Sequence, residues 1–418
     1  MKKTIKKITT VGLALSCAGV FLATAAGCGK REDGNTVRIS VWRPETETEF
    51  ANEVAEAFKK ANPDKKYSIT FADHGAGDIA TKILNDVENA GDVFSFPSDQ
   101  LNKLVNGDAL ARLGGDTLEK IKRENSAESV DSATTNLEGE ARTFAFPYTD
   151  NTFFLYYNKG ILSEEDVKSL DGILAKCTSS KRFAMPMTDG WYNTSFYFGK
   201  GLGYSVTYDD ALTETKITCD FGNETGKKVT KALQEVVNDT RVRADADDSK
   251  ILAGFADGSV VAATTGIWNR NAIQGYLKEN FGVAKLPTYT FARGESGEEQ
   301  VQLVSFAGYK LIGVSKHSKN LGEAIRFAEF YTNEQNQIKH FEKSGLVPTN
   351  TAAKNNEKVR SDVCAAAITE QLKYTKTQKD VPSTLWTPMQ ALGNAMITGK
   401  GSFDLEKELA ACVAAIRK

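Results

Sequence analysis

Histidine is scarce in this chain of 418 residues, which contains only three. No two cysteines have the spacing of a metal site, and the motifs HExxH, CxxC, GxxxxGK[ST] and GxSxG are all absent. We therefore expect no metal, no cofactor and no catalytic residues of these kinds.

The chain also lacks a surplus of positive charge, since 52 basic residues face 54 acidic ones for a net charge of −2. Nucleic-acid binding depends on clustered Lys and Arg, so we expect no nucleic-acid partner. With 41% apolar and 25% charged residues, the composition is that of an ordinary globular protein. The length predicts two or three domains, and the absence of repeats and long linkers favours two in close contact.

Long apolar runs are missing except for residues 11–26, which follow Lys2, Lys3, Lys6 and Lys7. This run is shorter than the roughly 20 residues that span a bilayer, and the pattern predicts a signal peptide over residues 1–27. Residues 25–28, Ala-Ala-Gly-Cys, resemble a bacterial lipobox, which implies that Cys28 is lipidated and that 28–35 form a tether on the extracellular face of the bacterial cell membrane. The alternative is simple cleavage after the Ala-Thr-Ala-Ala stretch.

Four cysteines remain once Cys17 leaves with the leader and Cys28 is acylated: Cys177, Cys219, Cys364 and Cys412. In an exported chain they could form two disulfides or stay as buried thiols. The sequence leaves both readings open.

Strand and helix patterns alternate along the N-terminal part of the chain. Residues 37–41 alternate apolar and polar side chains, and from Phe50 apolar residues recur every three or four positions until Asn62-Pro63. The order β-α-β-α-β-α predicts an α/β fold with a largely parallel sheet. We expect strands at 37–41, 67–71, 92–96 and 153–157, helices at 50–61, 79–87, 101–105, 321–331 and 403–416, and a capping box at 163–166 opening a further helix, whereas 302–314 and 381–393 are apolar without a clear period.

Tryptophan is rare, and each of the four, Trp42, Trp191, Trp268 and Trp386, adjoins polar or turn residues. An indole face matches the C–H face of a pyranose ring, while neighbouring polar side chains bond the hydroxyls. The pattern predicts a sugar site, and the alternative is that these are packing tryptophans at strand ends. Acidic residues near them, Asp99, Asp150 and Asp189, could instead be the paired carboxylates of a glycosidase.

Several motifs together resemble the bacterial extracellular solute-binding protein family 1, the maltose-binding-protein-like lipoproteins of ABC transporters. The resemblance runs from about Val37 to the C-terminus. Its most specific pieces are Gly91–Val93 leading to Phe96, Phe146–Tyr148 leading to Leu155–Lys159, Phe255–Gly258 leading to Trp268, Phe281–Pro287, Gly345–Asn350, and Trp386 before the final helix.

This resemblance implies a two-lobe periplasmic-binding-protein-like α/β fold with discontinuous domains and a hinged ligand cleft. The implied boundaries are 36–149 and 308–354 for lobe I, 154–302 and 360–418 for lobe II, and 150–153, 303–307 and 355–359 for the hinge crossovers.

The resemblance also implies a set of ligand contacts, with aromatic surfaces from both lobes holding a sugar. Phe96, Trp268 and Trp386 correspond to stacking aromatics, Tyr192 to an aromatic contact, and Asp99 to a hydroxyl acceptor. Gln100 and Gln390 stand where relatives have arginines, and Asn151 where they have a carboxylate. The predicted substrate-binding residues are Trp42, Arg43, Phe96, Asp99, Gln100, Asn151, Trp191, Tyr192, Trp268, Arg270, Trp386 and Gln390.

The expected function is that of a monomeric, lipid-anchored binding protein that captures an oligosaccharide, with maltose or maltooligosaccharide favoured. It would deliver this ligand to the permease subunits of an ABC transporter for import, without making or breaking a bond. The alternatives are an exported glycoside-active enzyme and a surface polysaccharide-binding module.

Overall fold

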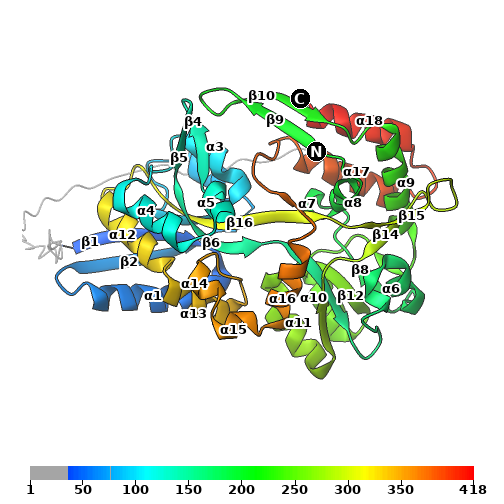
Figure 1. Ribbon diagram of the computed structural model, residues 1–418, viewed down its shortest axis with the longest axis horizontal. Helices are drawn as coiled ribbons and strands as arrows, with labels where there is room; N and C mark the ends of the chain where they lie inside the picture. The colour runs from blue at the N-terminus through cyan, green and yellow to red at the C-terminus, as the bar shows by residue number, and fades with distance from the viewer. Residues whose placement is uncertain (1–35, 76) are drawn as a thin grey trace, which may run out of the picture.

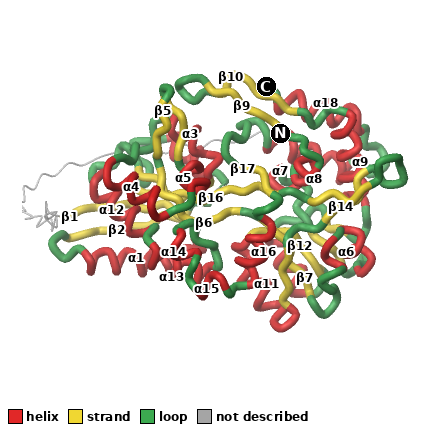
Figure 2. Tube along the Cα trace, viewed as in Figure 1, coloured by secondary structure: helices red, strands yellow, loops and turns green. Residues whose placement is uncertain are grey.

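The computed structural model describes residues 36–75 and 77–418, so the predicted signal peptide, the tether and Cys28 lie outside the described residues. The described part forms a mixed α/β fold of two lobes that lie side by side along the long axis (Figure 1). Each lobe has its own sheet with helices packed against it (Figure 2). None of the helices in these residues is long and apolar enough to cross a bilayer.

Lobe I, as we name it, is built on a six-stranded sheet in the order β17-β16-β3-β1-β2, with β6 paired to β16. The predicted alternation is present, because β1 is parallel to both β2 and β3. However, β16 is antiparallel to β3 and β6, so the sheet is mixed rather than largely parallel. Its elements are β1 (Thr36–Arg43), α1 (Thr48–Ala61), β2 (Lys66–Asp73), α2 (Ile79–Asn85), β3 (Val93–Pro97), α3 (Leu101–Asn106), α4 (Gly115–Glu124), α5 (Ala127–Ser132), β4 (Thr134–Leu137), β5 (Glu140–Thr143), β6 (Ala145–Asn151), β16 (Ser305–Val314), α12 (Leu321–Tyr331), α13 (Glu334–Ser344), α14 (Thr351–Lys354) and β17 (Thr375–Thr377).

Lobe II is built on a five-stranded sheet in the order β11-β8-β12-β7-β13. Strand β12 is buried along its whole length because it lies between β8 and β7 with helices on the faces. Its elements are β7 (Phe153–Asn158), α6 (Leu170–Lys176), β8 (Arg182–Ala184), α7 (Gly190–Asn193), α8 (Ser195–Gly199), β9 (Tyr204–Tyr208), β10 (Glu214–Cys219), α9 (Glu224–Asn238), β11 (Val242–Arg243), α10 (Asp248–Asp257), β12 (Val260–Gly266), α11 (Arg270–Leu277), β13 (Phe281–Ala284), β14 (Thr288–Phe291), β15 (Glu299–Gln302), α16 (Val363–Gln371), α17 (Trp386–Thr398) and α18 (Leu405–Ile416), with α15 (Glu357–Arg360) between α14 and α16.

The helix expected after the capping box begins later than predicted. Ser163 and Asp166 do form the reciprocal bonds, since Ser163 N donates to Asp166 Oδ2 at 2.9 Å and Asp166 N donates to Ser163 Oγ at 3.2 Å. These bonds precede only the 3-10 turn Asp166–Lys168, whose N-cap is Glu165. Helix α6 starts at Leu170 with Ser169 as its own N-cap.

Neighbouring segments of chain cross between the lobes side by side. Between β6 and β7, Thr152 Oγ1 lies 2.9 Å from Ser305 Oγ and donates to the Phe306 carbonyl at 2.7 Å. Both groups are buried, so these bonds tie the first crossing to the start of β16. The exact lobe boundaries stay a prediction.

A further connection, residues 375–385, which we call the strap, touches both lobes. Its strand β17 pairs with β16 in the lobe I sheet, although the sequence places 360–418 in lobe II. The reason is the backbone pairing of 375–377 with 305–307. Beyond β17 the strap enters the other lobe, where Val381 and Leu385 are buried in the core of lobe II.

The β9–β10 hairpin makes a second bridge, reaching from lobe II over to lobe I along the upper side of Figure 1. Its tip residue Leu212 is buried among Leu101, Leu104 and other core residues of lobe I. Asn106 Nδ2 donates to the Ala211 carbonyl at 2.8 Å. Leu212 has φ of +61°, a left-handed conformation that a branched residue adopts only under tertiary constraint. The hairpin tip therefore behaves as a fixed contact between the lobes.

The four remaining cysteines, for which the sequence left two readings open, are free thiols. Cys177, Cys219, Cys364 and Cys412 are all buried and none forms a disulfide. Burial raises the pKa of each thiol, which keeps it protonated at neutral pH.

Candidate ligand-binding cleft

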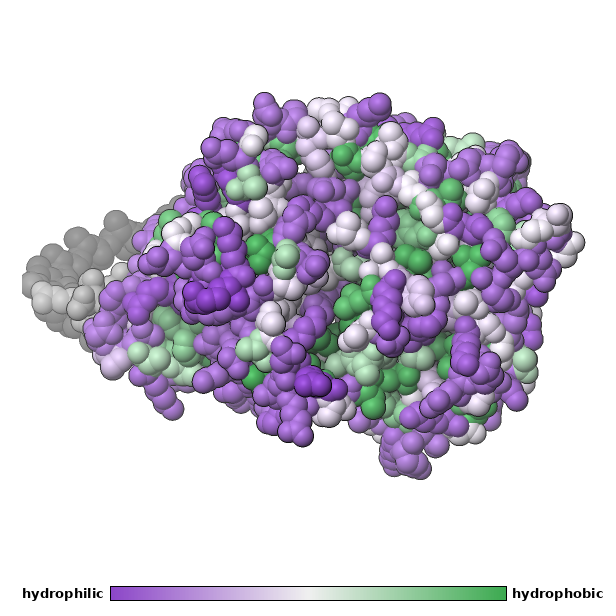
Figure 3. Space-filling model, in the orientation of Figure 1, coloured by the Kyte–Doolittle hydropathy of each residue, from purple (hydrophilic) through white to green (hydrophobic). Residues whose placement is uncertain are grey.

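A cleft with a volume of about 1610 Å³ lies between the two lobes and takes its walls from both. This is larger than the roughly 300–1,000 Å³ of a typical small-molecule pocket, so it can hold a ligand of several rings. The outer face around it is mostly polar, with apolar side chains grouped near the middle of the molecule (Figure 3).

The lobe I wall is polar and lies where strands end. Pro44 and Thr46 follow β1, and Asp99 and Gln100 form the 3-10 turn Ser98–Gln100 directly after β3. Ligands of open α/β sheets bind at the carboxyl ends of strands, as they would here. Lys310 on β16 and Asn151 on β6 also belong to this wall.

The lobe II wall is aromatic and acidic. Trp191 and Tyr192 lie on α7, Trp268 on the 3-10 turn Ile267–Asn269 after β12, and Trp386 begins α17. The remaining residues of this wall include Asp189, Asp247, Asp248 and Gln390. All three indoles of the cleft therefore belong to one lobe, and the expectation of aromatic surfaces from both lobes is wrong.

Trp268 has a fixed seat in this wall. Its indole lies against Gly266, where even a Cβ atom would collide with the ring, so the residue beneath it must be glycine. The indole Nε1 donates to Asp248 Oδ2 at 2.8 Å, and Asp248 Oδ1 accepts from Asn269 at 2.7 Å. These contacts hold the ring in one orientation.

Trp191 lies beside Trp268, with the ring centroids 5.9 Å apart and the planes 39° from parallel. It also contacts Phe153, at a centroid distance of 4.7 Å. Its backbone N–H donates to Asp189 Oδ1 at 2.8 Å, so Asp189 caps the short helix α7. The two indoles form a continuous apolar surface next to acceptor groups.

Two carboxylates of the cleft have raised pKa values. Burial raises the pKa of Asp99 to about 6, although the hydrogen bond that Asp99 accepts from Gln378 acts to lower it. Burial also raises the pKa of Asp189, which the charge of Asp248 raises further. Asp150 is buried beside Lys354, with Nζ and Oδ2 2.7 Å apart, and does not line the cleft. It is therefore not placed to pair with Asp99 or Asp189 in glycoside cleavage.

The structure brings together eight of the twelve residues that the sequence predicts. Their direct contact with a ligand stays a prediction. These eight are Asp99, Gln100, Asn151, Trp191, Tyr192, Trp268, Trp386 and Gln390.

Phe96 is a correction, because its side chain is fully buried in lobe I and cannot stack on a ligand. It packs against Phe94 at a centroid distance of 5.9 Å. Trp42 also lies outside the cleft wall. Its indole contacts His74, with the ring centroids 4.2 Å apart and the planes tilted by 38°, and packs on the lobe I core.

Both predicted arginines are likewise engaged elsewhere. Arg43 is buried and pairs with Asp73. Arg270 pairs with Asp362, and its guanidinium lies over the Phe341 ring at 5.8 Å. Neither lines the cleft, so the structure does not bring these two residues together with the other predicted contacts.

Sequence reasoning missed several cleft residues. Asp248 could have been found, because Asp247 and Asp248 open helix α10 at the point where Asp247 accepts the N-cap bond from Lys250 N at 2.8 Å. Lys310 and Gln378 carry no local signal, since strand pairing brings each of them to the cleft. Lys310 is placed by the pairing of β16 with β3 and β6, and Gln378 by the pairing of β16 with β17.

A metal centre finds no support among the residues that the structure describes. No group of three His, Cys, Asp or Glu side chains there is arranged to hold an ion. The polar groups of the cleft are carboxylates, amides, hydroxyls and lysines that can bond hydroxyls from a neutral ligand.

Comparison with known proteins gives one consistent family. The family model described as bacterial extracellular solute-binding protein matches residues 53–367, about three quarters of the chain. The galactooligosaccharide-binding protein of Bacillus subtilis (strain 168) is 24% identical over 404 residues, covering 92% of this chain and 91% of its own length.

Two further proteins are similar over nearly the whole described chain. A maltooligosaccharide ABC transporter solute-binding lipoprotein of Streptococcus pneumoniae serotype 4 is 23% identical, covering 93% of this chain and 90% of its own length. A structure solved with acarbose is 31% identical with a TM-score of 0.81, covering 91% of this chain and 99% of that one.

Proposed function

The chain belongs to the bacterial extracellular solute-binding proteins, and we propose that it captures an oligosaccharide in the cleft, with maltose or maltooligosaccharide favoured. It releases this ligand to the permease subunits of an ABC transporter for import. The Bacillus and Streptococcus relatives are named for oligosaccharides, which supports this choice of ligand. As a binding protein it makes and breaks no bond in its ligand.

The observation that carries the proposal is the pair of unlike walls facing one cleft. Trp191, Trp268 and Trp386 supply apolar faces on lobe II, and Asp99 and Lys310 supply hydrogen-bonding groups on lobe I. A pyranose has apolar C–H faces and a rim of hydroxyls, so each wall suits a different part of the same ring. A ligand that contacts both walls favours the closed arrangement by its differential affinity.

The proposed protein works at the outer face of the bacterial membrane. Its Cys28 carries a lipid after removal of residues 1–27, and residues 28–35 link the anchor to β1. Removal of the four lysines of the leader changes the net charge from −2 to −6. The protein acts as a monomer in this proposal.

Replacement of the stacking indoles tests the function. Trp268→Ala and Trp386→Ala should each weaken oligosaccharide binding by about 1–3 kcal/mol, the usual loss for a buried aromatic contact. Isothermal calorimetry with maltose, maltotriose, longer maltooligosaccharides and galactooligosaccharides measures this. A micromolar dissociation constant for the unchanged protein corresponds to about 8 kcal/mol, so such losses are easily resolved.

Trp42→Phe is the matched control, because this indole packs against His74 outside the cleft and its replacement should leave affinity unchanged. If Trp268→Ala and Trp386→Ala both bind oligosaccharide as tightly as the unchanged protein, the two indoles do not contact the ligand. Release of reducing ends by the purified protein would instead favour the glycoside-active enzyme. Binding to intact polymer without lobe closure would favour the surface polysaccharide-binding module.

A further inference from the structure

Gln378 on the strap lies at the floor of the cleft, where the two lobes and β16 meet. Only 4% of its surface is exposed. Its backbone N–H donates to the Ala307 carbonyl at 2.9 Å, which fixes the residue to β16. The neighbouring Gly308 leaves room for it, since a Cβ at that position would collide with Gln378 Oε1. The chain thus holds this one side chain closely in place.

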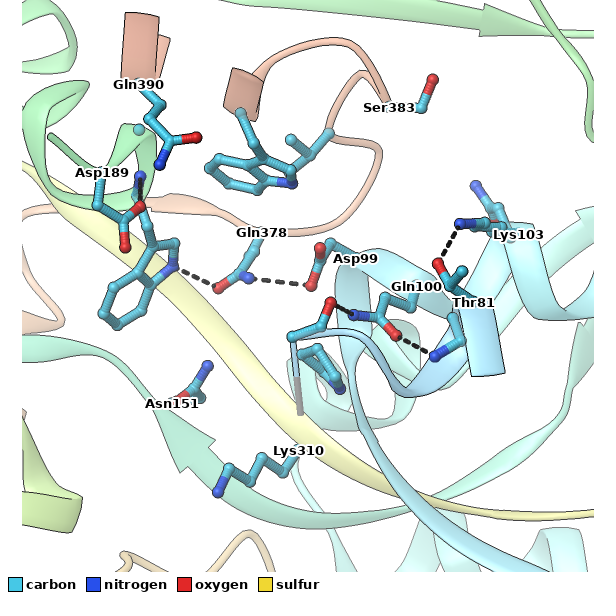
Figure 4. A pocket seen from close by; sticks show the side chains of 18 of the residues that line it. Thr81, Asp99, Gln100, Lys103, Asn151, Asp189, Lys310, Gln378, Ser383 and Gln390 are labelled. Atoms are coloured by element: carbon cyan, nitrogen blue, oxygen red, sulfur yellow. Dashed lines mark hydrogen bonds between the residues drawn. The ribbon is translucent and has the colours of Figure 1, made fainter. Parts of the chain in front are cut away.

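The Gln378 amide joins a residue of each lobe. Its Oε1 accepts from Trp191 Nε1 at 3.0 Å, and its Nε2 donates to Asp99 Oδ1 at 3.0 Å (Figure 4). An indole N–H can only donate and an ionised carboxylate can only accept, so a single orientation of the amide satisfies both partners. The two hydrogen bonds therefore run in one donor-to-acceptor order across the cleft, from Trp191 through Gln378 to Asp99.

This bond is the constraint on the indole that comes from outside lobe II. Phe153, Trp268 and the backbone bond to Asp189 hold Trp191 from its own lobe. Gln378 fixes the remaining N–H edge of the ring. Without it, the partly buried indole N–H would lose this partner, and the ring would lose one restraint on its tilt.

We propose that Gln378 is a positioning residue of the sugar site, whose amide sets the plane of the Trp191 indole against the ligand by tying it to Asp99 of the opposite lobe. This inference rests on the proposed function. It adds a residue that acts on the ligand only indirectly, by orienting the Trp191 side chain.

A double-mutant cycle measured by calorimetry with the best-binding oligosaccharide tests it. Gln378→Met keeps the side-chain volume but removes both hydrogen-bonding atoms, and should weaken binding about tenfold. Trp191→Phe keeps a ring but removes the N–H donor. Both changes break the same bond, so their effects should not add. In the Trp191→Phe background, adding Gln378→Met should weaken binding by less than about threefold relative to Trp191→Phe alone.

A pH profile separates positioning from a merely structural role. Gln378→Glu keeps the acceptor for Trp191 but places a second carboxylate beside Asp99. At pH 7.5 the two charges repel, whereas at pH 5.0 one shared proton restores a bridge. The affinity of Gln378→Glu, taken relative to the unchanged protein at the same pH, should rise at least threefold from pH 7.5 to pH 5.0. The relative affinity of Gln378→Met should stay the same. Burial and the nearby charge of Asp99 raise the pKa of Tyr204 on β9, and neither variant replaces this residue.

Lys379→Ala is the control on the same strap, because it removes a contact with Asp131 outside the cleft and should leave affinity unchanged. Unchanged affinity in Gln378→Met, or losses that add in the cycle, would overturn the inference while the proposed function stands. A flat pH profile for Gln378→Glu would also overturn it. Failure of the unchanged protein to bind any oligosaccharide would overturn the proposed function, and this inference with it.

Discussion

At the scale of single residues, hydrogen bonds and ring contacts together hold the indoles of the cleft in place. Asp248 accepts from both Trp268 and Asn269, and Gln378 serves Trp191 and Asp99. Bonds of this kind each contribute about 1 kcal/mol net, but they cost more when one partner is left buried and unpaired. Their main effect is to keep the aromatic faces oriented before a ligand arrives.

Asp99 should make stability depend on pH in a specific direction. Its pKa is about 6 in the folded protein, above the roughly 3.9 of an unfolded chain. Between pH 4 and 6 the folded state keeps its proton while the unfolded state releases it, so the free energy of unfolding falls as pH rises through this window. Asp99→Asn removes this titration. The stability of the variant relative to the unchanged protein should therefore rise by up to about 2 kcal/mol from pH 4 to pH 7.

Urea denaturation at each pH measures this difference, since changes in all other groups cancel between the two proteins. A difference that stays constant from pH 4 to pH 7 would mean that the Asp99 carboxyl titrates normally in the folded state.

The sequence predicted the composition of the cleft better than its detailed contacts. Trp268 and Trp386 stood out because rare aromatics adjoined polar residues, and both line the cleft. Phe96 was misassigned because matching a position in the chain says nothing of the side chain's burial. Gln378 was missed because its place depends on strands 70 residues apart in sequence, and no local pattern encodes that.

At the scale of elements, the spacing of apolar residues predicted the helices and strands that have one buried and one exposed face. Helix α1 buries Phe50, Val54 and Phe58 on one side, and its spacing was readable. Strand β16 is central in its sheet and buried along most of its length, so its residues 305–314 show no alternation. Helix α17 does expose Thr387, Gln390 and Asn394 on one side, but the strap residues before Trp386 are not part of the helix, so residues 381–393 show no clear period.

The β9–β10 hairpin should limit how far the lobes separate. Leu212→Asn removes the apolar contact with lobe I but suits the positive φ, because Asn adopts that conformation readily. The change should remove about 1.5–3 kcal/mol of burial between the lobes. We expect the radius of gyration of the ligand-free protein to increase in small-angle scattering.

Leu212→Met serves as control, since it keeps an apolar side chain at the tip and should leave the scattering curve unchanged. If Leu212→Asn and the unchanged protein scatter alike, the hairpin tip does not restrain the lobes.

At the scale of the whole molecule, the lobes divide the work unequally. Lobe II carries the three indoles of the cleft, and lobe I carries Lys310, Asp99 and other polar groups. Under the proposed function, a sugar ring would contact the aromatic wall of lobe II, and its hydroxyls would meet the polar groups of lobe I. Two-lobe architecture followed from the resemblance, whereas this asymmetry required the arrangement of the elements in space.

Saturating oligosaccharide should make the protein more compact and more stable. Bridging both walls favours closure, so the radius of gyration should fall on addition of the ligand. At a ligand concentration of about 100 times the dissociation constant, mass action should add about 2.7 kcal/mol to the free energy of unfolding. Scattering and thermal denaturation on the same samples measure both effects, and binding without compaction would contradict hinge closure.

The direction of β1 has a consequence for how the protein stands on a membrane. Its carboxyl end leads to Pro44 at the cleft, so Thr36, where the described chain begins, lies at the far end of lobe I. The proposed eight-residue leash from Cys28 reaches at most about 28 Å. Lobe I would then stay close to the lipid surface and move little. Lobe II would make most of the movement that opens and closes the cleft as ligand binds and leaves.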